Sequence, residues 1–161
     1  MAKKSQQQGS GDGRKIVSRN RRARHDYNLE KSYDAGLVLM GSEIKSIRDN
    51  KVNLADGFVQ ERGGELWLMN THIAPYEKAH TYGHTDPRRP RKLLLHKREI
   101  NQIITQIRES SYTAVPTTLY LERGLAKVEI AIARGKRMYD KRQAIAKRDA
   151  QRDIERALRN R

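Results

Sequence analysis

The clearest periodic pattern along the chain is a set of isoleucines with helical spacing. Four of them recur at intervals of three and four residues, which places them on one face of a helix: Ile100, Ile103, Ile104 and Ile107. We therefore predict a helix between Lys92 and Ser110 whose isoleucine stripe faces the core. A short helix is also predicted after Gly41, with Ser42 as its N-cap and Glu43 in its first turn, where a carboxylate suits the helix dipole.

Elsewhere the pattern alternates between apolar and polar residues, which is typical of strands with one buried face. The last such segment shows this best, because Lys127 and Glu129 alternate with apolar residues. The predicted strands cover residues 26–30, 33–40, 57–61, 65–74, 113–122 and 125–133. The dipeptides Gly63-Gly64 and Arg123-Gly124 separate neighbouring strands and predict tight hairpin turns.

These elements amount to about six short strands and two helices in the centre of the chain. No regular alternation of strand and helix indicates a parallel sheet. The predicted fold class is mainly β with helices. We expect a six-stranded antiparallel barrel with flanking helices, similar to the oligonucleotide-binding (OB) barrel.

The net charge of +15 is concentrated at the two ends of the 161-residue chain. Residues 1–24 contain eight Lys or Arg and one acid, and residues 134–161 contain eleven and four. The centre is almost neutral, and the first residues are mostly small and polar, so they cannot form a core. We therefore expect a disordered basic arm (1–18), an OB-like barrel (19–133) and a basic C-terminal tail (134–161).

The tail has a composition that favours a helix, because it is rich in Ala, Arg, Lys, Gln and Glu. Its apolar stripe is narrow and mostly alanine: Ala146, Ala150, Ile154, Ala157 and Leu158. Such a stripe buries too little surface to hold a helix against a protein core. We expect the tail to become helical when it binds a partner.

Several classes of protein are excluded by what the sequence lacks. There is no cysteine for a disulfide or zinc site, and no phosphate-binding glycine loop or nucleophile motif. His80 and His84 lie in a loop with prolines and are not expected to bind a metal. No apolar run could span a membrane, and Lys3 and Lys4 are not followed by the apolar stretch of a secretory signal. We predict a cytoplasmic protein that is not an enzyme, with no catalytic residues, cofactor or metal.

The basic ends are rich in arginine, whose planar guanidinium binds phosphate in a bidentate manner and stacks on bases. Five arginines lie near the N-terminus: Arg14, Arg19, Arg21, Arg22 and Arg24. In the tail, Tyr139 adds a stacking ring among basic residues, a combination that binds unpaired nucleotides. No helix with base-reading polar residues is evident, so single-stranded or irregular RNA is favoured over duplex DNA.

Two other functions are alternatives for a small basic protein of this kind. A ribosomal or RNA-chaperone protein with an OB-type barrel would share the basic ends of the chain. A small metal-dependent nuclease would need clustered carboxylates, whereas the acids here are scattered.

Several long motifs, in order and at family spacing, resemble those of the bacterial SsrA-binding protein family, also called small protein B. The motifs are Asn20–Tyr27, Ala35-Gly36, Gly41–Arg48, His72–Tyr76, Arg89–Glu99 and Ala133–Arg142. The resemblance covers roughly residues 15–158. A general RNA chaperone has no reason to contain Gly135–Arg142 at this spacing.

The resemblance implies a protein that binds the tRNA-like domain of transfer-messenger RNA and brings it to stalled ribosomes, where a peptide tag is added. It also implies an OB-like barrel as the body. The basic tail would enter the decoding centre and the empty mRNA channel of the small subunit, against its rRNA, and become helical there. Elongation factor Tu is expected in the same complex, and the protein is expected to be a monomer that binds no membrane.

Two sets of site residues follow. RNA-contact positions of the family match Asn20, Asp34 and Leu94, with Asp34 in place of the usual Glu. A carboxylate there can accept hydrogen bonds from guanine N–H groups. The full predicted body site also includes basic residues: Arg21, Arg22, Arg24 and Lys92. The predicted ribosome-binding tail site consists of Gly135, Lys136, Arg137, Tyr139, Asp140, Lys141, Arg142, Lys147 and Arg148.

Overall fold

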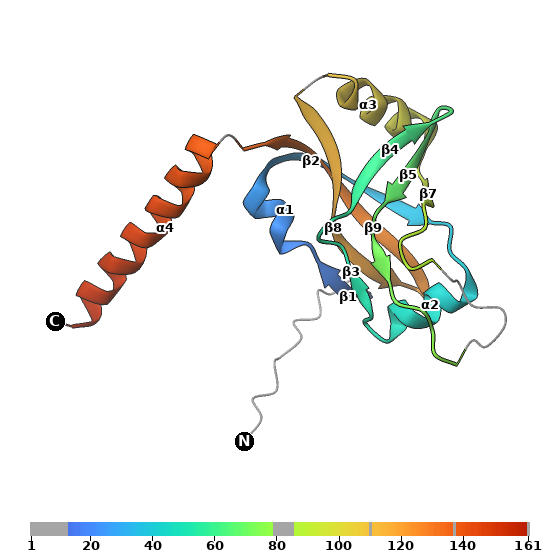
Figure 1. Ribbon diagram of the computed structural model, residues 1–161, viewed down its shortest axis with the longest axis horizontal. Helices are drawn as coiled ribbons and strands as arrows, with labels where there is room; N and C mark the ends of the chain where they lie inside the picture. The colour runs from blue at the N-terminus through green and yellow to red at the C-terminus, as the bar shows by residue number, and fades with distance from the viewer. Residues whose placement is uncertain (1–12, 79–85, 110, 137, 161) are drawn as a thin grey trace.

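The computed structural model describes residues 13–78, 86–109, 111–136 and 138–160 (Figure 1). These residues form nine strands and four helices. In chain order they are β1 (Arg14–Arg19), α1 (Arg21–Asp26), β2 (Tyr27–Leu37), α2 (Gly41–Arg48), β3 (Val52–Asn53), β4 (Phe58–Arg62), β5 (Glu65–Met69), β6 (His72–Ile73), β7 (Arg91–Leu94), α3 (Lys97–Ile107), β8 (Tyr112–Glu122), β9 (Leu125–Gly135) and α4 (Met138–Arg159). His80 and His84 lie outside the described residues.

Seven of the strands form one antiparallel sheet in the order β1-β8-β9-β2-β7-β5-β4, and β3 pairs with β6 separately. The two predicted hairpins are confirmed. Gly63 and Gly64 join β4 to β5 with φ of 58° and 77°, and Arg123 and Gly124 join β8 to β9 with φ of 51° and 77°. Positive φ at both central residues gives the turn a twist that matches the strands.

The mainly β, OB-like class with an antiparallel sheet and flanking helices is confirmed, and it differs from the prediction in that the sheet is not closed into a barrel. In the described residues the sheet curls without a ladder between its two outer strands, β1 and β4 (Figure 1). The additional strand β1 pairs with residues 118–122 of β8, on the edge that β9 does not occupy.

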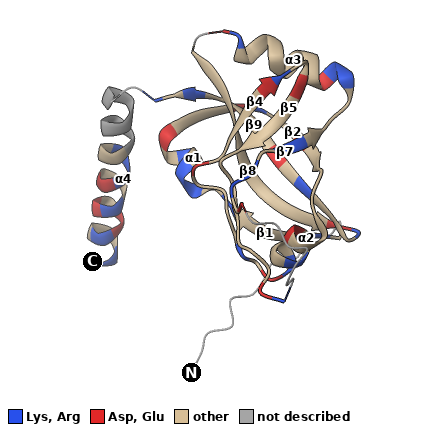
Figure 2. Ribbon diagram, turned by 45° about the vertical axis from the view of Figure 1, so that its right-hand side comes forward, with Lys and Arg blue, Asp and Glu red and all other residues tan. Residues whose placement is uncertain are grey.

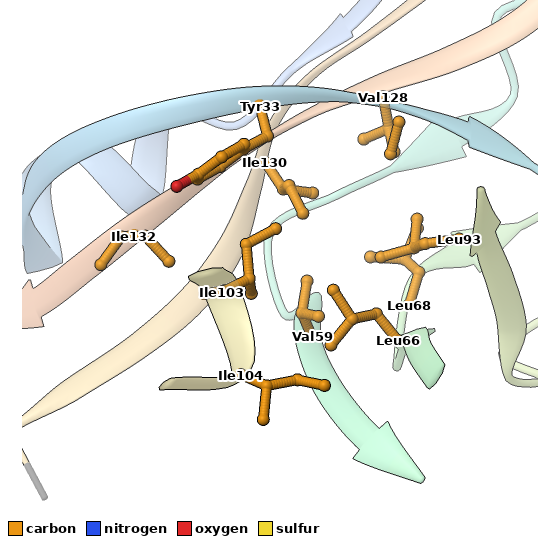
Figure 3. Close-up of a cluster of buried hydrophobic side chains, with 12 residues drawn as sticks. Tyr33, Val59, Leu66, Leu68, Leu93, Ile103, Ile104, Val128, Ile130 and Ile132 are labelled. Atoms are coloured by element: carbon orange, nitrogen blue, oxygen red, sulfur yellow. The ribbon is translucent and has the colours of Figure 1, made fainter. Parts of the chain in front are cut away.

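Helix α3 covers the inner face of the sheet and forms the main core with it. Its isoleucine stripe is confirmed, with Ile103 and Ile104 buried in a cluster with apolar side chains of the sheet (Figure 3). The other labelled members of this cluster are Tyr33, Val59, Leu66, Leu68, Leu93, Val128, Ile130 and Ile132. A second cluster includes Ile47 of α2 and packs this helix against the rest of the body. Its buried members are Ile47, Leu54, Ile73, Leu119 and Ala126.

The N-terminal boundary differs from the prediction. Residues 14–18, assigned to a disordered arm, lie in β1, and the basic segment that follows forms helix α1. The β-branched residue Val17 packs against the second cluster. Its apolar contact and the ladder with β8 involve residues far along the chain. The local sequence, which is mostly basic, therefore did not indicate a strand here. Residues 1–12 are outside the description.

Three local predictions also change. The strands predicted at 26–30 and 33–40 are one strand, β2, whose register with β9 shifts between Leu29 and Ser32. The helix predicted within residues 92–110 begins at Lys97, and the start of that stretch belongs to strand β7, which the sequence did not predict. Helix α2 begins at Gly41, so its N-cap is Met40 rather than Ser42.

Helix α4 extends away from the sheet (Figure 1), and its residues from Ile145 to Asn160 are exposed. The expectation that the apolar stripe does not dock on the body is therefore confirmed. The segment Met138–Arg159 is helical in this structure, and the dependence of that helix on a bound partner stays a prediction. Among the described helices, none has the combined length and apolarity needed to cross a membrane.

Candidate nucleic-acid interface

Two residues of the predicted body site, Asp34 and Leu94, lie at one hollow on the face of the sheet that is opposite the core. Strands β2 and β7 pair with Gly36 opposite Leu94. Because alternate side chains of a strand share a face, Asp34 projects on the same side as Gly36 and its neighbour Leu94. We call this feature the Asp34–Leu94 hollow; its volume is about 350 Å³, and its lining includes His96, Glu99 and Lys127.

Gly36 allows the two strands to approach closely at this hollow. A Cβ on Gly36 would lie 3.2 Å from the Cβ of Leu94, which is tighter than ordinary contact. Leu94 itself is 51% exposed. The hollow therefore combines an apolar surface, a carboxylate acceptor and the cation of Lys127, which together suit an unstacked nucleotide.

Tyr120 on β8 orients the carboxylate of Asp34. The phenolic hydroxyl donates a hydrogen bond of 2.9 Å to Oδ1 of Asp34. The guanidinium of Arg14, on β1, lies over the Tyr120 ring at 4.9 Å from its centroid. Burial and the hydrogen bond to Asp34 raise the pKa of Tyr120 to about 12. The hydroxyl is therefore protonated at neutral pH and available to donate.

Glu122 connects Arg14 and Lys127 beside this hydrogen bond. Lys127 Nζ lies 2.8 Å from Oε2 of Glu122, and Arg14 Nε lies 3.7 Å from Oε1. The hydrogen bond from Lys127 is the main reason that the pKa of Glu122 is lowered. Lys127 therefore forms an ion pair with Glu122 and also lines the hollow.

Asn20, the third residue matched to a family RNA contact, is buried and holds α1 in place. Its Oδ1 accepts the backbone N–H of Ala23 at 3.0 Å, which caps the helix. Its Nδ2 donates to the carbonyl oxygens of Leu54 at 3.1 Å and Pro116 at 2.9 Å. The structure therefore gives Asn20 a positioning role, and its direct contact with RNA stays a prediction.

Of the three predicted arginines of α1, Arg22 lines a different hollow, of about 470 Å³, between α1 and the loop before β4. Arg22 forms ion pairs with Asp26 at 3.4 Å and Asp56 at 3.2 Å, and Arg21 and Arg24 are exposed. Exposed pairs contribute only about 0–1 kcal/mol, so Arg22 can exchange these carboxylates for phosphates. The structure does not bring the α1 arginines together with Asp34 and Leu94.

Lys92 is also outside the Asp34–Leu94 hollow. It lies on the same face of β7 as Leu94, but its Nζ is 2.8 Å from Oε1 of Glu65 on β5. This ion pair is partly exposed.

The base of the tail is attached to α1. Gly135 pairs with Tyr27 at the end of the β2–β9 ladder. The backbone N–H of Lys136 donates to the carbonyl of Asp26 at 3.1 Å, and its Nζ donates to the carbonyl of Arg24 at 3.3 Å. Beyond this point the predicted tail residues divide into three groups. Arg137 is outside the described residues, Tyr139, Asp140, Lys141 and Arg142 belong to α4, and Lys147 and Arg148 are exposed on α4.

A third hollow, of about 430 Å³, lies beside this attachment and includes Arg24, Lys136 and Glu129 in its lining. Thr117 fixes the carboxylate there, since its hydroxyl lies 2.9 Å from Oε1 of Glu129. Along α4 itself, basic and acidic positions are interleaved (Figure 2). The exposed part of the tail therefore offers cations beside a narrow apolar stripe, in which Ile154 and Leu158 are exposed.

A family model described as "SmpB protein" matches residues 17–160. This chain belongs to the SmpB family. The match covers the body from the middle of β1 and all of α4, so the resemblance inferred from the motifs is confirmed.

Curated SmpB relatives support the same assignment over the full chain. The SsrA-binding protein of Geobacillus thermodenitrificans is 54% identical over 151 residues, which is 94% of this chain and 96% of that protein. That of Roseiflexus sp. is 56% identical over 150 residues, covering 93% and 95%. That of Thermobifida fusca is 54% identical over 161 residues, covering 100% and 99%.

A solved structure described as "tmRNA-SmpB: a journey to the center of the bacterial ribosome" has a similar chain. The TM-score is 0.66 at 46% sequence identity, and the match covers 81% of this chain and 94% of that chain.

One structural feature of this SmpB family member was missed by the sequence analysis. Glu43 and Arg91 are both fully buried and form an ion pair of 2.5 Å, and Arg89 donates to the other oxygen of Glu43. Arg91 also donates to the carbonyl oxygens of Thr71 at 2.6 Å and Pro87 at 2.9 Å. The cluster therefore ties α2, β7 and the segments around β6 together.

The charges of this cluster are maintained by their mutual contacts. Burial by itself would raise the pKa of Glu43, but hydrogen bonds from Arg89 and the Met40 backbone, with the charge of Arg91, lower it overall. Burial lowers the pKa of Arg91, and Glu43 opposes that effect. The sequence suggested only a first-turn acid at Glu43, because its partners are distant along the chain.

Proposed function

We propose that this chain is an RNA-binding adaptor that binds transfer-messenger RNA and delivers it to stalled ribosomes for trans-translation. The observation that carries the proposal is the Asp34–Leu94 hollow. In a chain that matches SmpB proteins over nearly its whole length, two residues distant in sequence meet there. Together with Lys127 they supply the acceptor, apolar surface and cation that a nucleotide requires.

The body and the tail have different tasks in this proposal. The sheet and α1 bind the tRNA-like domain of transfer-messenger RNA, with Asp34 and Leu94 contributing selectivity. The exposed arginines Arg21, Arg22 and Arg24 contribute phosphate contacts that carry no sequence information. The tail, from Gly135 through α4, binds small-subunit rRNA in the decoding centre and the empty mRNA channel.

The proposal also covers the setting of the reaction. The chain acts in the cytoplasm as a monomer, within a complex that includes elongation factor Tu. It catalyses no reaction itself, since its contribution is to position RNA on the ribosome.

The test is a binding titration of the full chain with the tRNA-like domain of transfer-messenger RNA and with an unrelated tRNA. We expect Asp34→Ala to weaken binding of the tRNA-like domain by roughly 1–3 kcal/mol, and to weaken tRNA binding less, because a base-edge acceptor is lost. Asp49→Ala is the matched control, since Asp49 is an exposed acid beyond α2. It should leave both affinities unchanged.

Two results would contradict this function. An equal loss for both RNAs with Asp34→Ala would mean that Asp34 only supports the fold. Equal affinity of the unaltered chain for every structured RNA would favour the alternative, a general RNA-chaperone or ribosomal protein.

A further inference from the structure

A fourth hollow lies between β2 and α3, and none of the predicted RNA-binding residues line it. This groove has a volume of about 510 Å³. Strand β2 contributes Lys31 and Tyr33, and α3 contributes Arg98, Asn101 and Gln102, together with Gln106 one turn further along. We call it the α3–β2 groove.

The α3–β2 groove differs from the other three hollows in the charged residues that line it. Each of the others is lined by at least one carboxylate, as with Asp56 beside α1, Glu129 at the base of the tail and Glu99 in the Asp34–Leu94 hollow. The lining of the α3–β2 groove contains two cations, Lys31 and Arg98, and no acid. It therefore favours an anionic ligand.

The two cations are placed differently. Lys31 is held over the Tyr33 ring, with Nζ 5.0 Å from its centroid, and it donates to Oε1 of Gln102 at 3.4 Å. Arg98 is exposed on α3, and within the described residues it forms no ion pair. One cation is thus fixed by neutral groups and the other is available to a ligand.

The amide side chains supply matching hydrogen-bonding groups. Oε1 of Gln102 accepts from Lys31 and also from the hydroxyl of Tyr33 at 3.3 Å. With its oxygen engaged, Gln102 has its NH2 group to offer, and an NH2 group donates to an acceptor such as a phosphate oxygen. The groove therefore presents donors and positive charge, which is what a phosphate backbone requires.

The position of the groove indicates which anion it takes. Strand β2 and the N-terminal half of α3 line both this groove and the Asp34–Leu94 hollow: Tyr33 and Arg98 face one, and Asp34 and Glu99 face the other. Within the described residues, strand β7 pairs with β2 only at Gly36 and Leu37, so it does not cover this edge of β2 beside Lys31 and Asp34. An RNA strand that placed a base at Asp34 could pass around this edge and continue its backbone along α3.

We propose that the α3–β2 groove binds the phosphate backbone of the same RNA, next to the nucleotide held at the Asp34–Leu94 hollow. This inference rests on the proposed function and adds a second contact region to it. The contact is sequence-independent, because phosphates are common to all RNAs.

The experiment measures the affinity of the full chain for both RNAs over a range of salt concentrations. In the double variant Lys31→Ala and Arg98→Ala, two phosphate contacts are lost. The slope of log affinity against log salt should therefore fall by about 1.4–1.8, or 0.7–0.9 for each contact. The loss should be the same for the tRNA-like domain and the unrelated tRNA, so that their affinity ratio is preserved.

Lys97→Ala is the matched control. Lys97 is an exposed cation adjacent to Arg98 on α3, but it does not line the groove. Its slope should equal that of the unaltered chain. A second variant, Gln102→Leu, removes the amide donor with no change of charge, and it should weaken both RNAs at every salt concentration with the slope unchanged.

The outcomes are distinguishable. An unchanged slope in the double variant, with selectivity for the tRNA-like domain intact, overturns the groove proposal and would fit a groove for an acidic protein segment. A fall of about 0.7–0.9 with Lys97→Ala, the value for one lost contact, also overturns it, since charge alone would then explain the effect. Failure of the unaltered chain to distinguish the two RNAs overturns the proposed function instead.

Discussion

The hydroxyl of Tyr120 reaches across strand β9 to donate a hydrogen bond of 2.9 Å to Oδ1 of Asp34. Tyr120 is 2% exposed, whereas Asp34 is exposed at the edge of the hollow. A rigid, buried donor thus fixes the orientation of a carboxylate that faces solvent. Because the carboxylate is already oriented, Asp34 has less rotational freedom to lose when it binds a base.

We expect Tyr120→Phe to reduce selectivity for the tRNA-like domain. The variant keeps the buried ring and loses one hydrogen bond, so the loss should be about 0.5–1.5 kcal/mol, with less effect on an unrelated tRNA. Binding titrations of both RNAs measure it. Tyr112→Phe is the control, because Tyr112 donates to Glu30 at 3.4 Å, outside the hollow. Equal weakening by the two variants would remove Tyr120 from the recognition site.

The same tyrosine predicts a feature at alkaline pH. The pKa of Tyr120 is raised to about 12, above the ordinary value near 10. Its contribution to the free energy of unfolding should be fully present below pH 10 and lost as the pH rises through 12. Phenolate absorbance should show a transition near pH 12 that is missing in Tyr120→Phe. If the variant retains that transition, the phenol that titrates is another one.

Substitution of Asn20 should separate its two structural roles. In Asn20→Asp the carboxylate can still accept from the N–H of Ala23, but it cannot donate to Leu54 and Pro116. We expect a loss of roughly 1–3 kcal/mol in the free energy of unfolding, because two buried carbonyls lose a donor. Urea denaturation measures it. An unchanged stability would mean that the cap alone matters at this position.

Glu43→Gln should strongly destabilise the fold. It removes one charge from a fully buried pair and leaves Arg91 without its counter-ion, which costs about 3–5 kcal/mol. The control is Glu65→Gln, whose partner Lys92 is partly exposed, and its loss should be below about 1 kcal/mol. Similar losses in urea denaturation for the two variants would contradict a special role for the buried cluster.

The buried pair also gives a pH dependence. The pKa of Glu43 lies below its ordinary value in the folded chain, so its contribution is present above about pH 4.3, the ordinary value. It is lost as the pH falls through the lowered pKa. Acid unfolding of Glu43→Gln should therefore depend less steeply on pH in that range than that of the unaltered chain.

In the tail, recruitment and tagging should be separable. We expect Asp140→Ala, Lys141→Ala and Arg142→Ala together to leave RNA delivery nearly intact and to abolish tagging, because these residues belong to α4 rather than to the body. A reconstituted stalled-ribosome assay scores the two steps. The control has the same charge change further along α4: Asp153→Ala, Arg156→Ala and Arg159→Ala. Normal tagging by the first variant, or its failure to bind free RNA, would contradict the division between body and tail.

Local patterns were sufficient where neighbouring residues alone specify the element. The isoleucine spacing of α3 predicted both the helix and its buried face, because that stripe has to leave water. The glycines at Gly63 and Gly64 predicted their hairpin, because the turn requires positive φ. Family motifs then indicated Asp34 and Leu94 as site residues.

Other features depend on contacts between segments far apart in the chain, and only the tertiary structure decided them. Strand β1 is too basic to be recognised locally, yet pairing with β8 gives its backbone groups partners. Glu43 and Arg91 are costly to bury separately, so nothing in either segment predicts their burial. The Tyr120–Asp34 hydrogen bond also joins residues that are far apart in the chain, so only the folded sheet brings them together. The sequence by itself determined the family, helix α3 and the two tight hairpins, whereas the packing of the sheet determined the additional strand β1 and which polar groups meet.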